Sequence, residues 1–177
     1  MNYPEKHYQI VQNLLNGKFI LQEENIYNIV SINFDFYKIF FKESFKYELV
    51  KTSEVIYLAS DNSSEKFSRN LMLILAILVD NINLEGKDLY EELYKNFTIE
   101  DIENIIKNSS YKNVCRKIVI ENLIKNDCQK RNIIKYNSDY DTFQFTSAIN
   151  TFLEQAKEIA KTNYSYKKEE LEIKSKL

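Results

Sequence analysis

Apolar residues follow a helical period through the first 45 residues and a strand period directly after them. Segment 3–20, YPEKHYQIVQNLLNGKFI, predicts a helix of about three turns with Gly17 as its stop signal. Two more helices are predicted over 25–31 and 35–45. Segment 46–60, KYELVKTSEVIYLAS, contains two runs of strand-forming residues separated by KTSE, and this pattern predicts a β-hairpin.

The same order of patterns recurs after the polar segment 61–67. An apolar helix is predicted over 69–81, and the pairs Asp88 with Glu91 and Thr98 with Asp101 each mark the start of another helix. A longer helix is predicted over 111–128.

The stretch RNIIKYNSDYDTFQFTSAI, residues 131–149, alternates at the strand period on either side of the polar turn SDYD. It predicts a second hairpin, with Phe143 and Phe145 on one face and Ser147 as the cap of a last helix.

The predicted fold class is therefore mainly α with two small β-hairpins (α+β), arranged as tandem winged-helix domains. Two separate ribbons are too little sheet to be stable alone, but each can cover the helices beside it. The predicted organisation is an N-terminal winged-helix domain, a linker, a C-terminal winged-helix domain and a charged tail, over residues 1–60, 61–67, 68–160 and 161–177. The alternative is one all-helical domain without hairpins.

Composition narrows the class of protein. A chain of 177 residues with 44% hydrophobic residues can fill a core. The longest apolar run, Leu71–Val79, is about half of the roughly 20 residues that a membrane span needs, and the N-terminus lacks the apolar core of a signal peptide. We therefore expect a cytoplasmic protein with no membrane partner.

Candidate catalytic and metal-binding residues are few. The only cysteines, Cys115 and Cys128, are expected to be buried reduced thiols, since two thiols without histidines do not make a zinc site. The single histidine, His7, has no acid or nucleophile at a meaningful spacing and is expected at the surface. No phosphate-binding or metalloprotease motif occurs. The sequence thus favours a protein that is not an enzyme and needs no metal or cofactor.

Charge is segregated along the chain although the formal net charge is only -2. Residues 61–104 hold four Lys/Arg against ten Asp/Glu, whereas residues 105–135 hold eight against two. Lys112, Arg116 and Lys117 are predicted on one flank of the 111–128 helix. Contacts from such residues to DNA phosphates would be independent of sequence and sensitive to salt. The alternative is a solvated charged face.

Two other surfaces are candidates for partners or solvent. Helix 35–45 carries more aromatic residues than one core face requires, so it is the candidate protein interface; the residues are Phe36, Tyr37, Phe40 and Phe41. A purely core role is the alternative. The turn SDYD carries two acids and is a poor probe for phosphate.

Four segments together resemble a known family. They are NGKFI after the first helix, SRNLMLILAILVDNI followed by GKDLYEEL, RKIVIENLIKND before the second hairpin, and FQFTSAINTFL after it. Their order is similar to that in the MukE/MksE subunit of MukBEF-type bacterial condensins, in the KITE tandem winged-helix group. The resemblance covers roughly residues 5–160, and FQFTSAINTFL is its most specific part.

The resemblance implies a non-catalytic, dimeric subunit that binds a kleisin (MukF/MksF-like) and, through it, an SMC-like ATPase (MukB/MksB-like). It implies a nucleoid-associated role in chromosome organisation and segregation or in plasmid defence. The DNA-contacting positions that it implies are Lys112, Arg116, Lys117, Lys125, Lys130 and Arg131. The chain departs from the family in having Asn126 and Asp127 in place of glycine at the helix-to-wing corner.

Two other functions stay open at this point. A stand-alone winged-helix transcription regulator would bind an operator with clear sequence preference. An enzyme or small-ligand protein would have a deep polar pocket.

Overall fold

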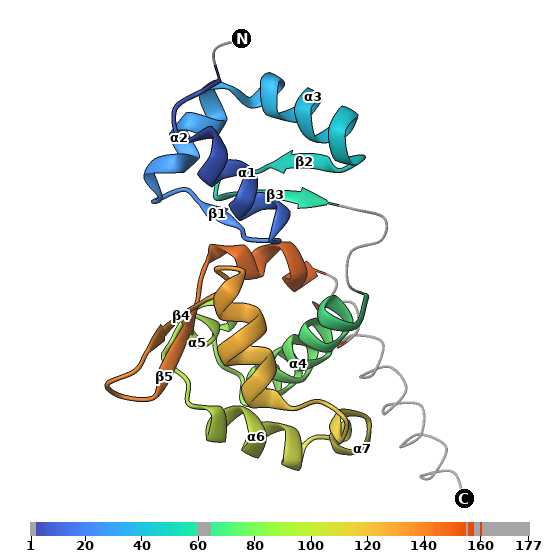
Figure 1. The fold of residues 1–177 in the computed structure, drawn as a ribbon. Helices are drawn as coiled ribbons and strands as arrows, with labels where there is room; N and C mark the ends of the chain where they lie inside the picture. The colour runs from blue at the N-terminus through green and yellow to red at the C-terminus, as the bar shows by residue number, and fades with distance from the viewer. Residues whose placement is uncertain (1–2, 60–64, 155, 158–159, 161–177) are drawn as a thin grey trace, which may run out of the picture.

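The computed structural model describes residues 3–59, 65–154, 156–157 and 160 (Figure 1). These residues form an N-terminal and a C-terminal unit that lie one above the other in the figure. The protein is mainly helical with two small antiparallel sheets, one in each unit. Both predicted hairpins are present, so the all-helical alternative is wrong.

The N-terminal unit begins with three helices and ends with a hairpin. Its elements in order are α1 (His7–Leu15), β1 (Ile20–Leu21), α2 (Asn25–Ile32), α3 (Phe34–Phe45), β2 (Glu48–Lys51) and β3 (Val55–Ala59). Gly17 ends α1 as predicted, with a φ of 73° that favours glycine. The two-residue strand β1 pairs with β3, so the strand order is β1-β3-β2. Two residues are too few for a strand period, and the sequence therefore did not predict β1.

The core of this unit is built on the inner faces of its helices and of its sheet. Ile10 of α1, Tyr37 and Phe41 of α3, and Ile56 of β3 are fully buried. Leu49 is opposite Leu58 in the β2–β3 register. The hairpin thus closes the core that the three helices leave open on one side.

The C-terminal unit has more elements in a similar order. They are α4 (Glu65–Leu84), α5 (Leu89–Leu93), α6 (Ile99–Asn108), α7 (Lys112–Cys115), the π-helix η1 (Asn122–Cys128), β4 (Ile134–Asn137), β5 (Thr142–Phe145) and the 3₁₀-helix η2 (Ser147–Ile149). Between α5 and α6, Phe97 pairs with Phe143 of β5 through two backbone hydrogen bonds of 2.8 Å. Phe143 and Phe145 are both buried, as the strand period predicted.

Helix α4 supplies the centre of the larger core. By length and composition Lys66–Leu84 is the one helix among the described residues that could cross a membrane. However, Leu71, Ile74, Leu75 and Leu78 of this helix are fully buried against the other helices and the β4–β5 sheet. Burial of this kind is typical of the central helix of a folded domain. Helix α4 also begins at Glu65, inside the segment predicted as a linker.

The predicted continuous helix over 111–128 is wrong, because the chain turns at residues 116–119 between α7 and the helical run that contains η1. Cys115 and Ile120 are both buried. In one continuous helix, positions five apart point roughly 140° away from each other. The turn lets both side chains enter the same core, and the β-branched residues Ile118 and Val119 have little preference for a helix there.

Two smaller predictions also need correction. Thr146, not Ser147, caps the last helical segment, because the Thr146 side chain accepts a hydrogen bond from the Ala148 amide. His7 is not a free surface residue, since its ring is stacked on Tyr3 with 4.4 Å between the ring centroids and contacts three aromatic rings of α3. The caps at Asp88 and Thr98 are confirmed, as are the buried free thiols of Cys115 and Cys128. The predicted tail, 161–177, lies outside the described residues.

Candidate nucleic-acid interface

Three of the predicted DNA-contacting residues gather at α7 and the turn that follows it. Lys112 lies on α7, and Arg116 and Lys117 follow it in the turn. All three are exposed, and none forms an ion pair with any residue that the structure describes. We refer to residues 112–119 as the α7 corner.

The α7 corner is held in place by buried neighbours. Cys115 is buried in the core of the C-terminal unit, and the Ile118 amide donates a 2.8 Å hydrogen bond to the Cys115 carbonyl. On either side of these anchors, Val114 and Val119 are 64% and 62% exposed. The corner thus presents basic and apolar side chains to solvent on a short, well-anchored loop.

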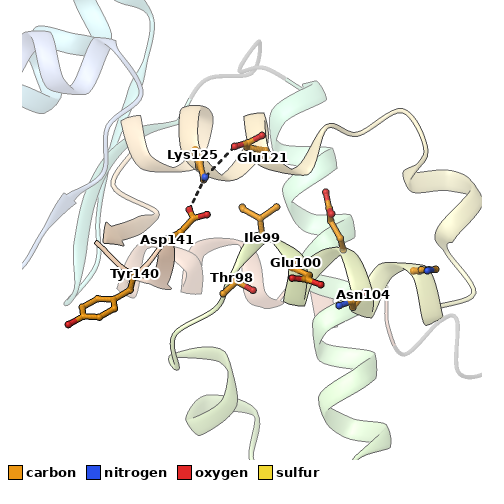
Figure 2. A pocket seen from close by; sticks show the side chains of 10 residues that line it. Thr98, Ile99, Glu100, Asn104, Glu121, Lys125, Tyr140 and Asp141 are labelled. Atoms are coloured by element: carbon orange, nitrogen blue, oxygen red, sulfur yellow. Dashed lines mark ion pairs between the residues drawn. The ribbon is translucent and has the colours of Figure 1, made fainter. Parts of the chain in front are cut away.

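Lys125 lies elsewhere and has partners of its own. It projects from η1 toward the tip of the β4–β5 hairpin, where its Nζ is 2.8 Å from Asp141 Oδ1 and 3.2 Å from Glu121 Oε1 (Figure 2). The ammonium also lies over the Tyr136 ring, 5.2 Å from its centroid. The hydrogen bond to Asp141 raises the pKa of Lys125, and the same hydrogen bond lowers the pKa of Asp141. Both groups are therefore charged at neutral pH and largely neutralise each other.

A groove runs between α6 and the hairpin tip beside Lys125 (Figure 2). It has a volume of about 690 Å³ and is open to solvent. Two lysines, Lys107 and Lys125, line it together with four acids: Glu100, Glu103, Glu121 and Asp141. This excess of negative charge makes the groove a poor place for a phosphate.

Lys130 and Arg131 differ although they are neighbours in sequence. Lys130 is exposed and forms no ion pair within the described part of the chain. Arg131 instead lies over the ring of Phe67 and donates a 3.1 Å hydrogen bond to the Asp127 carbonyl. Its Nε would be 3.6 Å from a Cβ at Gly17. Arg131 therefore occupies the junction between the two units, where it is well placed for stability and poorly placed for DNA.

The residue after Arg131 forms the corner between the helical run that contains η1 and the β4–β5 hairpin. Asn132 has a φ of 61°, whereas Asn126 and Asp127 lie inside the π-helix. The left-handed corner is thus five residues after Asp127 and six after Asn126, the positions that the resemblance implied. The Asn132 side-chain amide donates 3.0 Å hydrogen bonds to the Phe19 carbonyl and to Glu24 Oε2. A single asparagine therefore turns the chain and joins the C-terminal unit to β1.

The aromatic residues of α3 divide into two groups. Tyr37 and Phe41 are fully buried, and burial raises the pKa of Tyr37 to about 12. Phe36 and Phe40 are only partly buried, beside the His7 ring. Ile39, which the sequence did not single out, is 63% exposed on the same helix. The surface available to a partner is therefore formed by Phe36, Ile39 and Phe40, with Tyr37 and Phe41 beneath.

Several functional neighbours were missed because they come from distant parts of the chain. Asp141 is sixteen positions from Lys125, and its role depends on how the wing folds back on η1. No local pattern marks such a pair. The exposure of Val114 and Val119 in the α7 corner was not predicted, because it depends on the break in the predicted long helix.

The fold and these surfaces define a mainly helical protein with two small antiparallel sheets, an exposed basic corner and a helix, α3, on which Ile39 is exposed and Phe36 and Phe40 are partly exposed. Within the described ranges no group of three or more His, Cys, Asp or Glu side chains could hold a metal ion. A family model for the condensin complex protein MksE matches residues 5–157. The chain belongs to the MksE family, whose members are non-catalytic structural subunits of SMC-like condensin complexes. No curated protein matches the chain.

Proposed function

We propose that the chain is a tandem winged-helix subunit that binds a kleisin and DNA within its condensin complex. The winged-helix assignment is supported by a repeated topology. In the N-terminal unit, β1 follows the first helix and pairs with the last strand, β3. In the C-terminal unit, Phe97 precedes α6 and pairs with the last strand, β5. Each unit thus has an early extended segment that widens its hairpin into a wing.

The DNA contact is carried by the unpaired charges of the α7 corner. Lys112, Arg116 and Lys117 are exposed without acidic partners among the described residues. Lys130 is a further exposed contact on the same unit. Lysine and arginine contacts to phosphate carry no base code, so binding is sequence-independent and weakens steeply with salt.

The experiment for the DNA contact uses the assembled condensin complex. Replacing Lys112, Arg116 and Lys117 by Glu is expected to abolish retention on double-stranded DNA while kleisin binding continues. The matched control replaces Lys6, Lys46 and Lys51 by Glu, because these exposed lysines of the N-terminal unit form no ion pair with a described residue and the change in net charge is the same. Retention that falls equally in both variants would contradict a specific role for the α7 corner. Strong preference for one DNA sequence would favour a transcription regulator instead.

We propose that the kleisin binds to the surface of α3. Phe36, Phe40 and Ile39 present an apolar surface that Tyr37 and Phe41 support from the core. Partly exposed aromatic residues are enriched in protein interfaces. Replacing Ile39 by Ser is expected to weaken copurification with the kleisin. Tyr140→Ser on the wing should not, although Tyr140 is 77% exposed against 63% for Ile39. Equal kleisin recovery with both variants would move the contact to another surface.

The remaining parts of the proposal concern assembly and biological role. The subunit forms a homodimer, reaches the SMC-like ATPase through the kleisin, and is located in the cytoplasm on the nucleoid. The complex serves either chromosome organisation and segregation or plasmid defence. A strain without this subunit should show disordered nucleoids in the first case and increased plasmid retention in the second.

A further inference from the structure

The wing tip contains a carboxylate, that of Asp141, which forms an ion pair with Lys125. Asp141 is at the end of the turn between β4 and β5, with a φ of 50°. Its Oδ1 is 2.8 Å from Lys125 Nζ, and the same carboxylate accepts a hydrogen bond from the Tyr136 hydroxyl. Figure 2 shows the Asp141 and Lys125 side chains pointing toward each other from the wing and from η1.

The carboxylate oxygens that pair with Lys125 are anionic acceptors, as the oxygens of a nucleic-acid phosphate are. Asp141 and Glu121 present two anionic oxygens to one ammonium, so Lys125 with its two acids has a net negative charge. Glu100 and Glu103 line the same groove from α6, and Lys107 is the second lysine there. A DNA phosphate that approached Lys125 would have to displace Asp141 and overcome the repulsion of these acids.

The other exposed basic residues of the C-terminal unit differ from Lys125 in their ion pairs. Lys112, Arg116, Lys117 and Lys130 have no acidic partner among the described residues, so no such displacement is needed. The hydrogen bond from Lys125 lowers the pKa of Asp141, so the carboxylate stays ionised further into the acidic range than a free aspartate does. Lys125 is therefore held by carboxylates, whereas these four basic residues are free to meet a phosphate.

We propose that Asp141 is an internal competitor for DNA phosphate, which keeps Lys125 out of the DNA contact while the wing tip is closed. Displacement of the wing tip adds Lys125 to the contact and strengthens binding. This inference rests on the DNA contact proposed above. The acidic wing tip thus limits the affinity of the subunit for DNA.

The substitution Asp141→Asn tests the proposal with little disturbance of the fold. Asparagine has almost the same shape, tolerates a left-handed backbone and can still accept the hydrogen bond from Tyr136. It removes one of the two carboxylate charges that pair with Lys125, while Glu121, at 3.2 Å from the ammonium, stays in place. The matched control is Asp139→Asn in the same turn, because Asp139 is exposed and its carboxylate forms no ion pair with a described residue.

Binding of fluorescein-labelled double-stranded DNA is measured over a range of salt concentrations, with the full chain and with the assembled complex. Asp141→Asn is expected to bind several-fold more tightly, with a salt slope steeper by about 0.9, as one added phosphate contact requires. Adding Lys125→Gln to this variant should remove the gain. Differential acetylation read by mass spectrometry should show a more reactive Lys125 amine in Asp141→Asn.

The outcomes separate this inference from the proposed DNA contact. If the Glu variant of the α7 corner loses DNA but Asp141→Asn binds no better than Asp139→Asn, the competitor role of Asp141 is overturned and the corner contact stands. If the Glu variant still binds while Asp141→Asn tightens binding, the corner contact fails and the competitor role stands. If no variant, Asp141→Asn included, binds DNA, both are overturned.

Discussion

The guanidinium group of Arg131 lies over the ring of Phe67, with its Cζ 4.2 Å from the ring centroid. Phe67 is near the start of α4, and Arg131 follows the helical run that contains η1. The Phe19 amide donates a 3.0 Å hydrogen bond to the Arg131 carbonyl. Arg131 therefore links the first helix of the C-terminal unit, the helix before the wing and the loop that leads to β1.

Replacing Arg131 by Gln should lower the free energy of unfolding by about 1–2 kcal/mol, because the cation–π contact and the hydrogen bond to the Asp127 carbonyl are lost. Urea denaturation followed by circular dichroism measures the change. Lys130→Gln is the control and should change the stability by less than about 0.5 kcal/mol, since Lys130 is exposed. An unchanged stability together with lost DNA binding would return Arg131 to the DNA contact.

Asn132 allows the backbone and side-chain contributions at the corner to be separated. Asn132→Gly keeps the left-handed conformation and loses only the hydrogen bonds to Phe19 and Glu24, at a cost of about 1–2 kcal/mol. Asn132→Ala loses the same hydrogen bonds and keeps a Cβ in the left-handed region, which costs roughly 1 kcal/mol or more relative to glycine. Thermal unfolding should therefore rank the three proteins Asn, Gly, Ala in decreasing stability. An alanine variant as stable as the glycine variant would rule out the backbone contribution.

The capping box of α6 should be measurable by itself. Thr98 Oγ1 accepts a hydrogen bond from the Asp101 amide, and Asp101 accepts one of 2.7 Å from the Thr98 amide. Thr98→Ala should cost about 1 kcal/mol in the free energy of unfolding, whereas Thr98→Ser, which keeps the hydroxyl, should cost much less. Equal losses in urea titrations of the two variants would mean that the methyl group, not the cap, stabilises this turn.

The buried thiol of Cys128 should make the free energy of unfolding depend on pH in the alkaline range. Burial raises the pKa of its thiol to about 12, while the pKa of a cysteine in the unfolded chain is about 8.5. The native state keeps the proton that the unfolded state loses, so the stability should fall as the pH rises above about 9 toward 12. Cys128→Ala should flatten this alkaline limb in denaturation curves measured from pH 7 to about 10.

The same burial predicts slow alkylation of Cys128 in the native protein. Iodoacetamide at neutral pH should modify this thiol only at the rate of unfolding, because the reactive thiolate is not formed in the core. Peptide mass spectrometry before and after denaturation reads the difference. Rapid modification of Cys128 without unfolding would contradict its place in the core.

Local patterns predicted most of the elements. Helices α1 to α3, both hairpins and the SDYD turn depend on hydrophobic period and turn residues within a few positions of each other. The caps at Asp88 and Thr98 are likewise interactions over three positions. For the same reason the sequence alone could locate the basic residues of the candidate site, though not say which of them are free.

The tertiary structure decided which basic residues face solvent and where the chain departs from its local period. The break before η1 arises because Cys115 and Ile120 must enter one core, and β1 and Phe97 are extended only because β3 and β5 lie beside them. Lys125 is neutralised by Asp141, and Arg131 packs on Phe67, through contacts between segments far apart in the chain. Such pairings depend on how whole helices and strands pack together, and a pattern among neighbouring residues cannot show this.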